Sequence, residues 1–257
     1  MIQAIFFDID GTLVPHGKND MPESTKKALK ALKKKGIKLF IATGRPANSI
    51  DHVKAMFDFD GFLTANGQYC FNNETLIYEK YISKESIQQV IPYVEENKIG
   101  IIYASLEDCY RNQYIKNEFE YRRPLVNYDT LLNNNIVQIM VYINEEQDEE
   151  FLNHLPGCKS ARWSPLFADI IPSDGGKDQG INKIIDYYNI PLSNVMACGD
   201  GGNDITMLKH VPNSVAMGNA NDEVKKHADF VTTDIEDDGI LNACIHYGVL
   251  TREEIEL

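Results

Sequence analysis

The sequence contains few cysteines, and they form no recognisable metal or redox motif. Five occur among the 257 residues, and none stands in the Cys-x-x-Cys spacing of a zinc or redox site. They are scattered along the chain, at Cys70, Cys109, Cys158, Cys198 and Cys244. This pattern argues against a fold held by disulfides, and we expect reduced, mostly buried thiols in the cytosol.

Long apolar runs are also missing. The run from Ile136 to Ile143, which contains Gln138, falls far below the roughly 20 residues that a membrane-spanning helix needs. The first residues carry no basic leader, and Met1 is followed almost at once by a strand-like segment. We therefore expect a cytoplasmic protein that does not bind membranes.

Positive charge is scarce: 25 lysines and arginines stand against 38 acidic residues, for a formal net charge of −13. Nucleic-acid-binding proteins usually present a basic face, so this balance argues against such a partner. A phosphorylated substrate remains compatible, because a magnesium ion and a few cations can reverse the potential inside one pocket. Seven lysines between Lys26 and Lys38 indicate a solvated helix face, with an anion-binding patch as the alternative.

Short apolar segments alternate with amphipathic ones in the two ends of the chain. The segment from Ile2 to Asp8 is apolar on both faces, as in a buried strand of a parallel sheet. Further strands are predicted at 37–42, 62–64, 194–198, 215–217 and 230–232, and helices at 22–35, around 50–57 and at 177–188. Residues 68–81 resemble a hairpin after the Asn66-Gly67 turn. This alternation predicts an α/β fold with a doubly wound, mostly parallel sheet.

The middle of the chain differs in texture. Helix-like segments at 85–97 and 145–155 alternate with strand-like ones at 99–104, 136–143 and 168–171. We interpret residues 83–173 as an inserted α+β domain, and residues 1–82 and 174–257 as the domain that carries it. No residue of the insert is assigned to the site at this stage. Trp163 is expected to pack within the insert, with a place beside the site as the alternative.

Three polar clusters each follow a predicted strand: Asp8-Ile9-Asp10-Gly11-Thr12, Thr43-Gly44-Arg45, and Gly199-Asp200 with Asn203-Asp204. If the three strands are neighbours, all the clusters meet at one edge of the sheet, beyond the strands' carboxyl ends. That is where ligands bind in sheets of this type. The juxtaposition is more informative than any one cluster.

The first cluster places two carboxylates close together. Asp8 and Asp10 are two residues apart, so in an extended chain they point to the same side. Two dehydrated carboxylates repel each other unless a cation intervenes, and magnesium prefers oxygen ligands of this kind. Asp200 offers a third oxygen donor. The alternatives are loop aspartates that cap turns and a glycine-rich turn before a helix.

The other clusters offer groups that bind phosphate. Thr43 and Gly44 present a hydroxyl and backbone amides, and Lys177 is the candidate cation. Lys183 is the alternative to Lys177. Arg45 fits a residue at the start of a surface helix as well as it fits a ligand.

Together these motifs resemble the haloacid dehalogenase superfamily, and most closely its Cof-type, subclass IIB sugar-phosphate phosphatases. An Asp-x-Asp-Gly-Thr motif, a Thr-Gly-Arg motif, a lysine and a Gly-Asp-x-x-Asn-Asp motif occur in the expected order. The resemblance covers roughly residues 1–82 and 174–257, and it implies a Rossmann-like core with an inserted cap of the C2B type. In many relatives a glycine follows the lysine directly, whereas here it is Gly180, the third residue after Lys177.

The resemblance also implies roles. Asp8 is similar to the family nucleophile, and Asp10 is similar to the acid that protonates the leaving oxygen and later activates water. Mg²⁺ would be held by Asp8, the backbone carbonyl of Asp10 and Asp200. The phosphoryl group would be held by Thr43, Gly44, Lys177 and Asn203, while Asp204 and Thr12 would support these residues from behind.

The implied function is a magnesium-dependent phosphatase that acts on small phosphorylated metabolites, with sugar phosphates as the expected class. The cap would close over the substrate and select the leaving group. Two alternatives stay open: a phosphosugar mutase on the same core, and a noncatalytic sensor of a phosphorylated metabolite. The sequence leaves the oligomeric state open.

Overall fold

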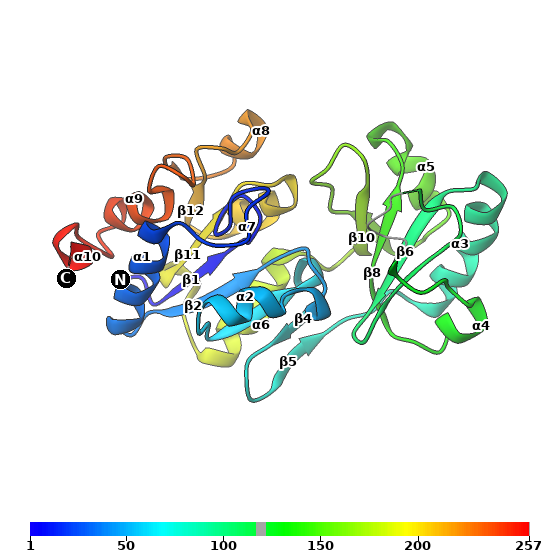
Figure 1. Cartoon of the computed structure of the whole chain (residues 1–257). Coiled ribbons are helices and arrows are strands. Elements are labelled where there is room, and N and C mark those ends of the chain that lie inside the picture. Colours follow the sequence, from blue (N-terminus) through cyan, green and yellow to red (C-terminus); the bar gives the residue numbers. More distant parts are fainter. Residues whose placement is uncertain (117–121, 257) are drawn as a thin grey trace.

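A computed structural model describes residues 1–116 and 122–256 of the chain, which form two layered units (Figure 1). The larger unit is an eight-stranded sheet in the order β13-β12-β11-β1-β2-β3-β4-β5. Its strands are β1 (Ala4–Phe7), β2 (Lys38–Ala42), β3 (Gly61–Thr64), β4 (Tyr69–Phe71), β5 (Leu76–Glu79), β11 (Val195–Gly199), β12 (Asn213–Ala216) and β13 (Phe230–Val231). The strands from β13 to β3 are parallel, and β4 and β5 add an antiparallel hairpin at one edge.

Helices cover both faces of this sheet. In β1, Ile5 and Phe7 pack with α1 (Glu23–Lys34) and α9 (Gly239–His246), while Ala4 and Phe6 pack with α6 (Lys177–Tyr188) and α7 (Ile205–His210). Strands buried on both faces need apolar residues at every position, and this explains the uninterrupted apolar segments. The predicted doubly wound, mostly parallel α/β sheet is confirmed.

The smaller unit is an antiparallel sheet of five strands in the order β7-β6-β8-β10-β9. Its strands are β6 (Gly100–Ser105), β7 (Cys109–Arg111), β8 (Ile136–Tyr142), β9 (Cys158–Ser160) and β10 (Ala168–Pro172). Helices α3 (Lys84–Asn97) and α5 (Asp148–Asn153) pack on one face. The other face turns towards the eight-stranded sheet, and Ile102, Ala104 and Val137 meet Ala65 there.

The remaining helices are short: α2 (Asp51–Met56), α4 (Tyr128–Leu131), α8 (Asp222–Lys225) and α10 (Glu253–Glu256). The helix predicted at 145–155 is wrong in its bounds, since a 3₁₀ turn at Glu145–Gln147 precedes α5 and α5 ends at Asn153. Asn144, the residue before that turn, accepts a hydrogen bond from the N–H of Gln147, the third residue of the turn, and so caps the start of the turn. The limits predicted for the core and the cap, 1–82 with 174–257 and 83–173, stay predictions.

Two compositional expectations can be compared with the structure. All five cysteines are free thiols, and only Cys158 is partly exposed. Lysines of the 26–38 segment pair with acidic neighbours, for example Lys26 with Asp20 and Lys35 with Glu254. Such pairing agrees with a solvated helix face. Within the described residues, no helix combines the length and the apolar character needed to cross a bilayer.

Candidate active site

The three polar clusters meet because their strands are neighbours. β1 lies between β2 and β11 and is parallel to both, so the carboxyl ends of the three strands face the same way. The Asp8 N–H donates to the carbonyl of Cys198 at 3.0 Å, which ties the start of one cluster to the strand before another. The structure therefore brings together the residues that the sequence placed at the ends of separate strands.

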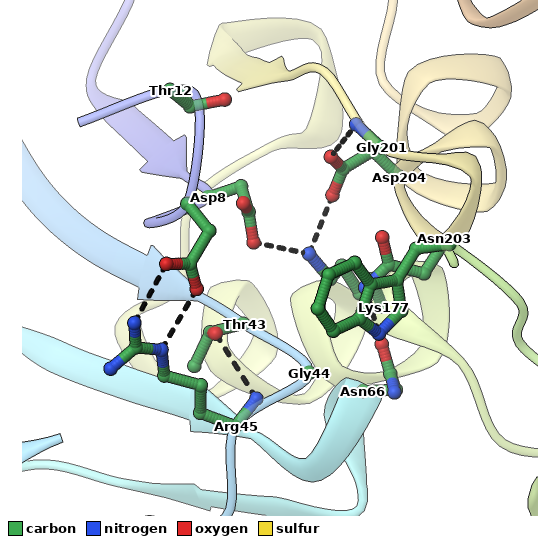
Figure 2. Close-up of polar contacts among 12 residues, drawn as sticks. Asp8, Thr12, Thr43, Gly44, Arg45, Asn66, Lys177, Gly201, Asn203 and Asp204 are labelled. Carbon is green, nitrogen blue, oxygen red and sulfur yellow. Dashed lines mark hydrogen bonds and ion pairs between the residues drawn. The ribbon is translucent and has the colours of Figure 1, made fainter. Parts of the chain in front are cut away.

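Lys177 occupies the centre of the cluster. Its Nζ lies 2.7 Å from Asp8 Oδ1 and 2.5 Å from Asp204 Oδ1 (Figure 2). Burial works to lower the pKa of this ammonium, but the two carboxylates raise it above its ordinary value. The alternative, Lys183, is exposed and lies over the Tyr78 ring 5.3 Å from its centroid. Lys177 is therefore the lysine that the fold places among the carboxylates.

Asp8 and Asp200 are poorly compensated despite this lysine. Burial raises the pKa of Asp8 well above its ordinary value, with Lys177 opposing the rise and Asp204 and Asp200 adding to it. Burial, followed by repulsion from Asp204, raises the pKa of Asp200 to about 7. Carboxylate oxygens of Asp8, Asp200 and Asp204 lie within 4.8 Å of one another. Such a group favours a cation.

The loops that carry these carboxylates are held by hydrogen bonds and close contacts. Thr12 Oγ1 donates to Asp200 Oδ1 at 2.7 Å, and Asp204 Oδ2 accepts the N–H groups of Asp200 and Gly201 at 2.9 and 2.8 Å. A Cβ at Gly11 would lie 2.1 Å from Asp200 Oδ2, and the φ of +86° there also favours glycine. Gly11 thus allows the first loop to approach Asp200.

Asp10 forms a bidentate ion pair with Arg45. Arg45 Nε donates to Oδ2 at 2.8 Å and Nη2 donates to Oδ1 at 2.7 Å. The hydrogen bonds with Asp10 raise the pKa of the guanidinium further, against the effect of its burial. Arg45 therefore contacts the predicted acid–base residue, an arrangement that neither interpretation of the sequence anticipated.

A chain of amides joins the predicted phosphate-binding residues to the cap. Asn203 Nδ2 donates to Asn66 Oδ1 at 2.9 Å, and Asn66 Nδ2 donates to Gln138 Oε1 at 3.0 Å and to Asp169 Oδ2 at 3.1 Å. Gln138 Nε2 completes the connection by donating to the carbonyl of Gly44 at 3.2 Å. Asn66 has a left-handed backbone (φ 54°, ψ 37°), which asparagine tolerates better than most residues.

A cavity of about 600 Å³ opens between the two sheets. Its core side includes Asp8, Asp10, Thr43, Gly44, Arg45, Asp200 and Asn203, and its cap side includes Arg123, Met140, Trp163, Ser164 and Asp169. Lys177 and Asp204 lie behind this surface, with 1% and 0% of their surface exposed. The cavity joins the predicted site to the cap.

The expectation that Trp163 packs within the cap is corrected by this arrangement. Trp163 lines the cavity and is 44% exposed, although its ring also packs edge-on against Phe167. Its indole N–H donates to Asp169 Oδ2 at 3.0 Å. The preceding loop approaches the core closely, since a Cβ at Gly202 would lie 2.6 Å from the carbonyl oxygen of Arg162. Residues of the insert therefore line the same cavity as the residues predicted from the core motifs.

Several site residues were missed by reasoning from the sequence. Asn66 was interpreted only as part of a turn, and Gln138 as an interruption of an apolar run. Asp169 carried a usable signal, because a lone carboxylate inside the apolar segment Ala168–Pro172 is unusual for a strand. No sequence signal links Arg45 to Asp10, because the pairing joins loops 35 residues apart.

Comparison with known proteins places the chain in a family. The family model for haloacid dehalogenase-like hydrolases matches residues 5–244. The protein named "Putative phosphatase YkrA" from Bacillus subtilis is 31% identical over 256 residues, covering 96% of this chain and 98% of its own.

Solved structures give the same result. A subclass IIB sugar phosphatase of the superfamily is 38% identical with a TM-score of 0.89, covering 96% of this chain and 100% of its own. A phosphatase of the superfamily from Bacteroides thetaiotaomicron is 32% identical with a TM-score of 0.90, covering 97% and 96%. The likeness extends over both the core and the cap.

Proposed function

The chain belongs to the haloacid dehalogenase superfamily as a Cof-type hydrolase, and from this premise we propose that it is a magnesium-dependent phosphatase. As a phosphoric monoester hydrolase it would act on small phosphorylated metabolites through a phosphoaspartate on Asp8. The observation that carries the proposal is the position of Asp8, which lines the cavity while Lys177 holds one of its oxygens at 2.7 Å. The cytoplasmic location expected from the sequence stays a prediction.

The residues present fit a magnesium ion by their charge and chemistry. Asp8, Asp200 and Asp204 bring three carboxylates together, Lys177 supplies one positive charge to them, and Arg45 is engaged by Asp10. The excess of buried negative charge suits a hard divalent cation with oxygen ligands. We propose that Asp8, the Asp10 carbonyl and Asp200 hold it. When bound, the ion supplies positive charge to the phosphoryl oxygens.

In the first step, a carboxylate oxygen of Asp8 forms a bond to phosphorus as the bond from phosphorus to the leaving oxygen breaks. Thr43, Gly44 and Asn203 hold the phosphoryl oxygens, and Lys177 reduces the repulsion between two anions. Asp10 gives its proton to the leaving oxygen, because a sugar alkoxide is too basic to depart without one. A carboxyl group cannot donate that proton while both oxygens accept from Arg45, so Arg45 has to release Asp10 first.

In the second step, water attacks the phosphorus of the phosphoaspartate. Asp10, now a carboxylate, takes the proton of that water, and the bond between phosphorus and the Asp8 oxygen breaks. Inorganic phosphate leaves and Asp8 is again a free carboxylate. Asp10 is back in its acid form, ready for the next leaving group.

Sugar phosphates are the substrate class that we propose. The support is the 38% identity with a solved sugar phosphatase of subclass IIB, over 96% of this chain. The cavity, at about 600 Å³, also lies within the usual range for sites that bind small molecules. Nucleic-acid and membrane partners are not part of the proposal.

The test is phosphate release from sugar phosphates, nucleotides and p-nitrophenyl phosphate, with Mg²⁺ or with EDTA, by the wild type and by Asp8→Asn. We expect magnesium-dependent turnover that Asp8→Asn lowers by at least about 10³-fold, since the nucleophile is removed. Activity that survives Asp8→Asn would contradict the assignment of the nucleophile. A requirement for a sugar bisphosphate activator would favour the mutase, and no turnover of any substrate would favour the sensor.

A further inference from the structure

Asp169 lies at a position of the cap that neither the catalytic steps nor the metal site uses. In β10 the neighbouring residues Ala168 and Ile170 point into the apolar cluster under the cap helices, so Asp169 points to the opposite face. Its partner across the sheet is Met140 in β8, and both residues line the cavity that contains Asp8. The carboxylate is therefore presented to the cavity from the cap side.

The two oxygens of this carboxylate differ. Oδ2 accepts hydrogen bonds from Trp163 Nε1 at 3.0 Å and from Asn66 Nδ2 at 3.1 Å. Oδ1 has no hydrogen-bond partner among residues 1–116 and 122–256, although the residue is only 1% exposed. Buried carboxylate oxygens are rarely left without a donor, so this oxygen requires an explanation.

Two hydrogen bonds keep the carboxylate in place. Asn66 and Trp163 hold Oδ2 from the core and from the cap loop, so the side chain cannot rotate without losing both hydrogen bonds. Burial raises the pKa of Asp169 to about 7, while these two hydrogen bonds and the charge of Lys177 oppose the rise. An acceptor held in this way suits a neutral hydroxyl donor, which satisfies the oxygen without adding charge.

We propose that Asp169 is a specificity-determining residue, whose Oδ1 accepts a hydrogen bond from a hydroxyl group of a sugar or polyol leaving group. This inference rests on the proposed phosphatase function, and it adds the residue that recognises the part of the substrate beyond the phosphate. The phosphoryl group is held at the core side, so a hydroxyl further along the substrate meets the cap side of the same cavity.

Hydroxyl recognition also explains why Asp169 is linked through hydrogen bonds to the predicted phosphate-binding residues. Asn66 contacts Asp169 and Asn203 at once, so the acceptor for the leaving group and a predicted phosphate ligand are held at a fixed separation. A substrate that satisfies both ends has to match that separation. Sites that hydrogen-bond a substrate hydroxyl discriminate strongly against analogues that lack it, because the buried acceptor is then left unpaired.

The experiment compares kcat/KM of the wild type, Asp169→Asn and Asp169→Ser on sugar monophosphates, on their single-deoxy analogues and on p-nitrophenyl phosphate, whose leaving group has no hydroxyl donor. The control is Asp129→Asn, the same change at an exposed cap residue that does not line the cavity. We expect one deoxy analogue to be a poor substrate for the wild type. The selectivity for the parent sugar phosphate over that analogue should fall about 10- to 100-fold in both Asp169 variants and remain unchanged in Asp129→Asn.

The selectivity ratios test the role of Asp169 separately from the phosphatase activity. An unchanged selectivity ratio, or equal losses on sugar phosphates and p-nitrophenyl phosphate, would overturn the role of Asp169 while leaving the phosphatase proposal intact. Turnover of p-nitrophenyl phosphate by each variant shows that it is folded and loaded with metal. A wild type that hydrolyses none of the substrates with Mg²⁺ would overturn both proposals together.

Discussion

The two walls of the cavity are built in different ways. The core wall is formed by loops at the ends of parallel strands, and ion pairs hold several of its charged side chains in place, as in the pairs of Asp10 with Arg45 and Asp8 with Lys177. The cap wall is one face of an antiparallel sheet with its loop. It presents Trp163 and Asp169, and one Asp169 oxygen has no donor among the described residues.

This difference separates chemistry from recognition. Groups that stabilise developing charge have to be held in place by partners before the substrate arrives, and the core wall meets that condition. A recognition surface needs donors and acceptors that only the right ligand satisfies, and the cap wall offers one. Substitutions on the core wall should therefore lower the turnover of every substrate, whereas those on the cap wall should change the preference among substrates that differ in their hydroxyl groups.

Asp10→Asn is expected to have a large effect on turnover. The amide keeps the shape but cannot transfer a proton, so kcat on sugar phosphates should fall about 10²- to 10⁴-fold. The loss on p-nitrophenyl phosphate should be smaller, because its leaving group is less basic. Steady-state kinetics with Asp186→Asn, an exposed residue of α6, as the control would measure it. Equal losses on both substrates would contradict the role of Asp10 as proton donor.

Lys177→Met is expected to reduce stability by about 3–5 kcal/mol, because it leaves Asp8 and Asp204 buried without their cation. Turnover of all substrates should also be lost. Urea denaturation of the metal-free protein measures the first effect, with Lys183→Met, an exposed lysine of the same helix, as the control. If both variants are equally stable, Lys177 does not compensate the buried carboxylates.

The effect of removing magnesium on the stability of the protein should depend on pH. Burial raises the folded pKa of Asp8 well above its usual range and that of Asp200 to about 7, so the folded metal-free protein binds more protons than the unfolded chain. Asp200 therefore makes the metal-free protein less stable as pH rises from about 4 through 7, and Asp8 acts in the same direction. Mg²⁺ at about 100 times its Kd should add about 2.7 kcal/mol at pH 8 and less at pH 5, where protons compete for the same oxygens.

Thermal denaturation with and without Mg²⁺ at the two pH values provides the measurement. Asp200→Asn is the matched variant, and it should lose most of the magnesium-dependent increase in Tm. Equal increases at pH 5 and pH 8 would show that the ion does not bind at Asp8 and Asp200.

The smallest effect is expected on the cap wall. Trp163→Leu removes the aromatic face and the N–H donated to Asp169, so KM for sugar phosphates should rise about 3- to 10-fold with little change in kcat. The control is Leu166→Ala in the same loop, where the side chain is 73% exposed. A uniform loss of kcat on all substrates would mean that Trp163 acts on the chemistry of the core wall, and the comparison of the two walls would fail.

Local sequence patterns were sufficient to predict much of the core wall. The apolar strand before Asp8, the paired carboxylates at Asp8 and Asp10 and the position of Lys177 at the start of a helix are all visible over a few residues. The rule that alternating strands and helices form a parallel sheet with ligands at the carboxyl ends then predicted that the polar clusters would meet if their strands were neighbours. These features need no knowledge of distant contacts, and for that reason the sequence alone determined them.

The tertiary structure decided which distant residues meet. Arg45 pairs with Asp10, Asn66 joins Asn203 to Asp169, and Trp163 lines the cavity. Each of these contacts depends on how the cap sheet faces the core and on close approaches such as that of Arg162 to Gly202. Side-chain periodicity specifies which face of an element is buried, but not which surface covers that face. The sequence by itself therefore determined the fold class and the candidate catalytic residues, whereas only packing between the two sheets decided what the cap contributes.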